Sequence, residues 1–99
     1  MQIMPHALQE LAKFLDAQIT TADVRTNGTT RTVGLRRSII SGTVIRKHVY
    51  LTQQDPVGTI DRARLIGKDG QVWAQRTDQQ LHAAGKGLLL EFRFTITEV

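Results

Sequence analysis

The stretch Leu88-Leu89-Leu90-Glu91-Phe92-Arg93-Phe94-Thr95-Ile96-Thr97 decides the fold, because an apolar side chain recurs at every second position. Five apolar residues thereby share one face of the segment: Leu88, Leu90, Phe92, Phe94 and Ile96. A period of two is typical of a β-strand with one buried face in an antiparallel sheet. We therefore expect this last strand to form the core of the sheet.

Turn signals divide the preceding chain into further strands. Asn27-Gly28 stands between β-favouring runs, and Asn-Gly in that context is the strongest short hairpin signal. Asp69-Gly70 separates the strand-like segments 59–66 and 71–76 in the same way. Thr43 to Thr52 is a further predicted strand. The remaining segments are expected to be connections between strands. These include the short stretch between Gly34 and Gly42 and the polar stretch from Thr77 to Gly87.

The start of the chain has a different period. Leu8, Leu11, Ala12 and Leu15 recur at the spacing of three and four that places them on one face of a helix, and Pro5 suits a first helical turn. We predict a helix over about residues 5–17, followed by a β meander over about residues 20–99. The fold class is α+β, mainly β: the amphipathic helix packs on an antiparallel sheet or small sandwich of five to six strands, in a single domain spanning residues 1–99.

Composition narrows the class of protein. The chain has 99 residues and no cysteine, and its aromatic residues are one Trp, one Tyr and three Phe. A disulfide scaffold is excluded, and so small a core favours association with further subunits, including copies of this chain. We find no apolar run long enough to cross a bilayer and no signal peptide, so we expect no membrane partner and synthesis in the cytoplasm.

The sequence holds no recognisable catalytic pattern. His6, His48 and His82 lack the spacing of metal ligands, and each is expected to lie at the surface or half-buried. Gly85-Lys86-Gly87 superficially resembles a phosphate loop but precedes a strand rather than a helix. No serine lies in a nucleophile elbow. We therefore expect a protein that is not an enzyme, with no catalytic residue, cofactor, metal or small-molecule substrate.

Positive charge is concentrated in the middle of the chain. The formal net charge is +4, and the segment from Val24 to Tyr50 contains no carboxylate. Its six cations are Arg25, Arg31, Arg36, Arg37, Arg46 and Lys47. Such a segment can meet an acidic protein surface or nucleic acid, and the alternative is that these residues are simply the solvated faces of strands. Trp73 is expected to pack in the domain's own core, with an exposed interface anchor as the alternative. The candidate interface residues are Arg36, Arg37, Arg46, Lys47 and Trp73.

The order of these segments carries a resemblance. The runs 6–15, 36–44, 58–66, 68–74 and 90–96, in this order, resemble the N-terminal region of bacteriophage tail-fibre and tail-collar-fibre proteins. Many proteins of that family have a glycine-rich Gly-x-Gly turn after the first strand, where this chain has Thr26-Asn27-Gly28-Thr29. The resemblance implies a non-enzymatic structural component of a phage, prophage or phage-like tail.

In such a tail the chain would serve at the tail tip, in the baseplate or as a fibre-attachment adaptor. Its partners would be copies of itself and other tail or baseplate proteins. It would be made in the cytoplasm of the bacterial host and would reside in the virion tail. The alternative function is a small basic nucleic-acid-binding module, which we disfavour because the basic segment holds a single aromatic residue, Tyr50.

Overall fold

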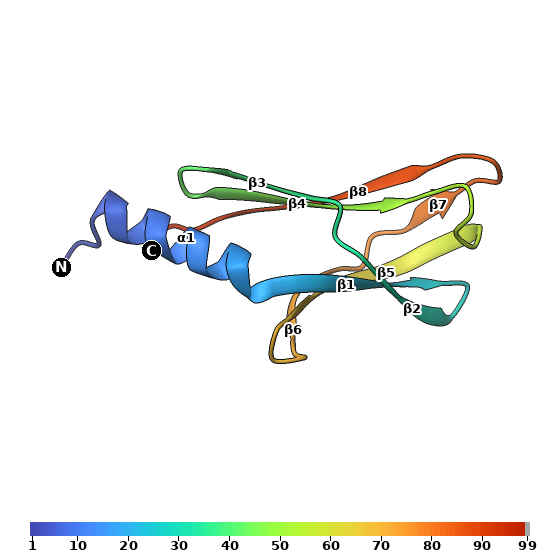
Figure 1. Ribbon diagram of the computed structural model, residues 1–99, viewed down its shortest axis with the longest axis horizontal. Coiled ribbons are helices and arrows are strands. Elements are labelled where there is room, and N and C mark those ends of the chain that lie inside the picture. Colours follow the sequence, from blue (N-terminus) through green and yellow to red (C-terminus); the bar gives the residue numbers. More distant parts are fainter. Residues whose placement is uncertain (99) are drawn as a thin grey trace.

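A computed structural model describes residues 1–98, which form one helix and two antiparallel sheets stacked in layers (Figure 1). The elements in chain order are α1 (Pro5–Gln18), β1 (Ile19–Thr26), β2 (Thr29–Val33), β3 (Arg37–Ser41), β4 (Val44–Leu51), β5 (Gly58–Gly67), β6 (Val72–Arg76), β7 (Gln80–His82) and β8 (Leu88–Thr95). The mainly-β class with an N-terminal helix on antiparallel sheets is confirmed.

The chain crosses from one sheet to the other more than once. Sheet A has the order β2-β1-β5-β6, with β7 also pairing to β5, and sheet B has the order β3-β4-β8. The pairs β1–β5 and β4–β8 join strands that are not neighbours in sequence. The predicted meander is therefore wrong beyond the individual hairpins, because local turn signals do not report long-range pairing.

Two short strands lie in segments that we expected to be connections. β3 occupies most of the stretch between Gly34 and Gly42, and β7 lies within the stretch from Thr77 to Gly87. The described chain therefore has eight strands rather than five or six. Neither segment has the long period-two pattern of β8, so their strand state depends on pairing with β4 and β5.

The hairpin turns are those that the dipeptides predict. Asn27 and Gly28 both have positive φ, 51° and 82°, which is the conformation of a two-residue type I′ turn. Gly70 has φ of 78° in the β5–β6 turn. These turns explain why Asn-Gly and Asp-Gly are reliable signals of a hairpin, because most other residues adopt a positive φ only at a cost in free energy.

The core lies between the two sheets. Its members are Ile19, Ala22, Val24, Val49, Leu51, Ile60, Ala63, Leu65, Leu90 and Phe92. The alternation in β8 is confirmed, because Leu90 and Phe92 are buried while Glu91 and Arg93 are exposed. However, β8 lies at one edge of sheet B and β4 lies at its centre, which corrects the expected central position of the last strand.

The helix extends the molecule at one end, and the described chain measures 51 × 23 × 21 Å (Figure 1). The start of α1 at Pro5 and its end at Gln18 agree with the prediction. Its inner face is narrower than expected, because Ala12 is buried and Leu8 and Leu15 are half-buried but Leu11 is 51% exposed. No helix of the described chain is long and apolar enough to span a membrane.

Candidate functional site

The outer face of sheet B gathers the basic residues of the central segment. Ile45, Lys47, Val49 and Leu51 point into the protein, so the intervening residues of β4 point outward. Strand register places Arg37 beside His48 and Arg93 beside Arg46. The Arg36 guanidinium lies 4.6 Å from the centre of the Tyr50 ring, a cation–π distance. We define the arginine face by these six residues: Arg36, Arg37, Arg46, His48, Tyr50 and Arg93.

The arginines of this face lack carboxylate partners. Within residues 1–98, no carboxylate oxygen lies within 4 Å of the guanidinium nitrogens of its four arginines. Sheet A contrasts with this, since Arg25 and Arg64 lie 2.7 Å from Asp61 and Asp23, respectively. The positive charge of the arginine face is therefore available to a ligand.

One carboxylate borders the arginine face. The His48 Nε2 atom lies 2.8 Å from Glu91 Oε2, in the same cross-strand row as Arg37. This hydrogen bond holds the pKa of the Glu91 carboxyl below its ordinary value, and the positive charges of Arg46 and Arg93 act in the same direction. Glu91 thus stays ionised and offsets only part of the charge of the face.

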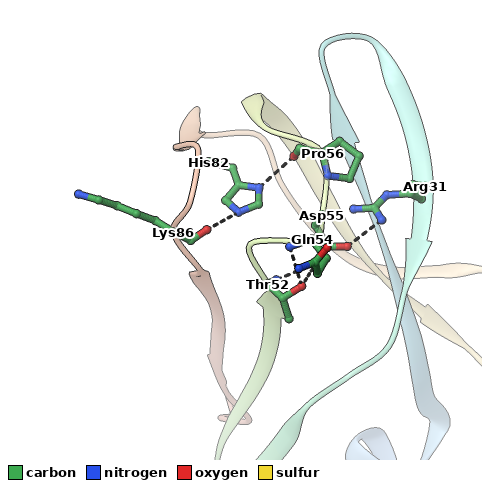
Figure 2. Close-up of polar contacts among 7 residues, drawn as sticks. All are labelled: Arg31, Thr52, Gln54, Asp55, Pro56, His82 and Lys86. Atoms are coloured by element: carbon green, nitrogen blue, oxygen red, sulfur yellow. Dashed lines mark hydrogen bonds and ion pairs between the residues drawn. The ribbon is translucent and has the colours of Figure 1, made fainter.

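The loop before β5 and the loop before β8 meet at His82 (Figure 2). The His82 ring joins them, with Nδ1 at 2.9 Å from the Pro56 carbonyl and Nε2 at 2.8 Å from the Lys86 carbonyl. The next residue, Gly87, lies against the Tyr50 side chain so closely that a Cβ atom there would overlap the phenol oxygen. The glycine therefore lets the loop pack on the ring over which Arg36 lies.

His82 is 1% exposed, which corrects the expectation of a surface or half-buried residue. The reason is its position at the end of β7, beside Gly58 of β5 and beneath both loops. Both of its partners are carbonyl acceptors, so both contacts are hydrogen bonds only when each ring nitrogen carries a proton.

In the loop between β4 and β5, Asp55 accepts hydrogen bonds from the Thr52 backbone and from Arg31 of β2, each at 2.7 Å (Figure 2). The hydrogen bond from Arg31 is the main cause of the lowered pKa of Asp55. Arg31 is thus committed to loop structure and does not join the arginine face.

Lys47, a predicted interface residue, lies inside the protein with 2% of its surface exposed. Its Nζ atom lies 2.8 Å from Asp16 Oδ1 and donates hydrogen bonds to the Asp16 carbonyl and the Ser38 hydroxyl, both at 2.9 Å. These contacts tie the C-terminal part of α1 to sheet B. The alternation of β4 is the missed signal, since position 47 has the same parity as Ile45 and Val49.

Trp73 is 36% exposed on the edge strand β6 and does not belong to the core cluster, so the expected core position is wrong. Its Nε1–H donates a hydrogen bond of 3.0 Å to Asp69, and its indole lies against Gly67. The hydrogen bond from Trp73 is the main cause of the lowered pKa of Asp69. The residue is engaged by its own hairpin and lies on the sheet opposite to the arginine face.

The structure therefore unites Arg36, Arg37 and Arg46 and separates them from Lys47 and Trp73. It also adds Arg93, which pairs with Arg46 across 47 positions of sequence and has no local signal in the chain. No group of three or more His, Cys, Asp or Glu side chains able to hold a metal lies in residues 1–98. Comparison with protein-family models, with curated proteins and with solved structures finds no match.

Proposed function

We propose that the protein is a non-enzymatic subunit of a larger assembly and that the arginine face docks on an acidic surface of a neighbouring subunit. The observation that carries this proposal is the set of four guanidiniums without carboxylate partners in residues 1–98. An interface that supplies carboxylates would gain charge-assisted hydrogen bonds there. The resemblance to tail-fibre proteins suggests a phage, prophage or phage-like tail as the assembly.

The small size of the domain supports association. The core cluster contains one aromatic residue, Phe92, and each sheet ends in edge strands that offer unpaired backbone groups. Copies of the chain or other tail or baseplate proteins would cover such edges. The arginine face would then select the partner, because charge complementarity steers association and disfavours wrong partners.

The experiment is a charge reversal, Arg36→Glu with Arg37→Glu, followed by light scattering and a sizing column. The protein is measured alone and mixed with the structural proteins encoded beside it. We expect the wild type to form a complex that the double variant loses, through lost pairing and new repulsion. The matched control is Lys13→Glu with Lys68→Glu, which changes the net charge equally but lies off the face, and it should retain the complex. A monomeric wild type that binds none of these proteins would overturn the proposal.

Nucleic-acid binding is the second candidate, favoured by the placement of Tyr50 among the arginines on an open sheet face. An aromatic ring beside guanidiniums is suited to stacking a base and holding its phosphate. A gel shift with arbitrary DNA on the same variants separates the two functions. Micromolar binding at physiological salt, lost in the Arg36→Glu, Arg37→Glu variant while its assembly stays intact, would favour nucleic acid.

A further inference from the structure

Arg46 and Arg93 stand directly opposite each other on β4 and β8. Like charges in this position destabilise an antiparallel pair. Glu91, the carboxylate that borders them, is engaged by His48. The fold therefore holds two guanidiniums side by side, and no carboxylate of residues 1–98 forms an ion pair with either of them.

These two arginines line a depression of about 220 Å³ together with Ile39, Ser41 and Val44. Ile39 pairs with Arg46, and Ser41 pairs with Val44, so the lining residues occupy adjacent rows of sheet B. A water molecule takes about 30 Å³ of liquid, so the depression has room for a side-chain carboxyl group and its methylenes. It combines two cations, one hydroxyl donor and two aliphatic side chains.

We propose that this depression receives the carboxylate of a glutamate side chain from the neighbouring subunit. The proposal rests on the docking function of the arginine face and names its anchor point. Guanidiniums bind carboxylates through paired N–H donors, and two of them can bind both oxygens of one carboxylate. Ile39 and Val44 would contact the methylenes of the glutamate. A phosphodiester carries its charged oxygens between two sugars rather than at the end of a slender aliphatic stem, so a depression with two aliphatic side chains favours glutamate over nucleic acid.

The test is an NMR titration that follows the Nε–Hε signals of the arginines at constant ionic strength. The probe is the blocked peptide acetyl-Gly-Glu-Gly-amide, and acetyl-Gly-Gln-Gly-amide is its uncharged counterpart. We expect the signals of Arg46 and Arg93 to shift together and to saturate with the glutamate peptide only. Arg46→Gln and Arg93→Gln should each weaken binding at least about tenfold, a loss of about 1.4 kcal/mol. Arg37→Gln, on the same face but outside the depression, should bind within about twofold of wild type.

Three results would overturn the proposal. Linear, unsaturated shifts of all exposed arginines would show general screening rather than a site. Wild-type affinity in folded Arg93→Gln would remove the arginine pair as its basis. Tighter binding of dimethyl phosphate than of the peptide would assign the depression to a phosphate-bearing partner.

The outcome is separable from that of the docking function. If the Arg36→Glu, Arg37→Glu variant loses its partner but the peptide never binds wild type, only the depression is wrongly assigned. If the peptide binds at Arg46 and Arg93 but no complex forms with any structural protein, the docking function fails and the oxyanion site stands.

Discussion

Both sheets carry arginines on their outer faces, but they differ in what neutralises them. In sheet A, Arg64 makes a bidentate pair with Asp23 directly across the strands. Arg25 makes a bidentate pair with Asp61, which lies at the register shift next to its cross-strand neighbour Arg62. In sheet B, Arg46 faces Arg93, and no carboxylate oxygen of residues 1–98 lies within 4 Å of either guanidinium. Two arginines of sheet A thus hold the fold through carboxylates, and Arg62 of the same sheet donates a hydrogen bond to the Thr30 hydroxyl. The four arginines of the arginine face have no carboxylate within 4 Å in residues 1–98.

Acid should act on the two sheets unequally for the same reason. The hydrogen bond from Arg25 is the main cause of the lowered pKa of Asp61. A carboxyl whose pKa is lower in the folded than in the unfolded protein stabilises the fold above the unfolded value, and this contribution is lost as the pH falls through the folded value. Sheet A therefore loses the Arg25–Asp61 stabilisation in acid, and sheet B loses only the smaller contribution of Glu91, whose pKa is lowered mainly by His48. The four arginines of the arginine face have no carboxylate within 4 Å in residues 1–98.

The largest expected effect is on the inner face of sheet B. Phe92→Ala should lower the free energy of unfolding by about 3 kcal/mol, because Phe92 is 5% exposed and its removal leaves a cavity between the sheets. Arg93→Ala, the neighbour on the outer face, should cost under about 1 kcal/mol. Urea unfolding measures both. Equal losses would contradict the assignment of one face to the core and the other to a partner.

An intermediate effect is expected from breaking a pair in sheet A. Arg64→Gln should lower the free energy of unfolding by less than Phe92→Ala and by more than Arg93→Ala, because it leaves the Asp23 carboxylate, on a residue only 8% exposed, without its guanidinium. We expect this loss of stability to be smaller than that for breaking a fully buried ion pair, because the Arg64 side chain is 26% exposed. Thermal and urea melts of Arg64→Gln and Asp23→Asn, with the double variant, give the coupling between the two residues. No coupling would mean that the carboxylates of sheet A do not distinguish it from sheet B.

Local patterns predicted much of the fold. The helix from Pro5 and the Asn27-Gly28 and Asp69-Gly70 turns depend on neighbouring residues, and the sequence contains those residues. The β1–β5 and β4–β8 pairings depend on which strands meet after the chain has crossed between sheets, and no short segment encodes that.

The candidate site was predicted in part. Arg37 and Arg46 lie on neighbouring strands and Arg36 directly precedes the first of them, so a count of charges in one short segment was enough to find all three. Arg93 required the β4–β8 register. Lys47 was misassigned because a charge count ignores strand parity, and parity places it among buried residues. A cluster of charged residues in the sequence predicts a charged surface only when the face of the strand that each residue occupies is also taken into account.

The smallest expected effect has the opposite sign. Arg93→Gln should raise the free energy of unfolding at low salt by about 0.3 kcal/mol, because it removes the repulsion from Arg46 across the strands. The gain should vanish near 1 M salt, where the screening length falls to about 3 Å. Arg93→Lys is the matched control, since it keeps the charge and should show no gain.

Chemical unfolding at two salt concentrations, with urea as the uncharged denaturant, is the measurement. A gain that persists at high salt would assign the change to packing rather than to charge. A loss comparable to that of Arg64→Gln would show that Arg93 takes part in an interaction that holds the fold. Sheet B would then be neutralised within the protein like sheet A, and its outer face would no longer be a surface reserved for a partner.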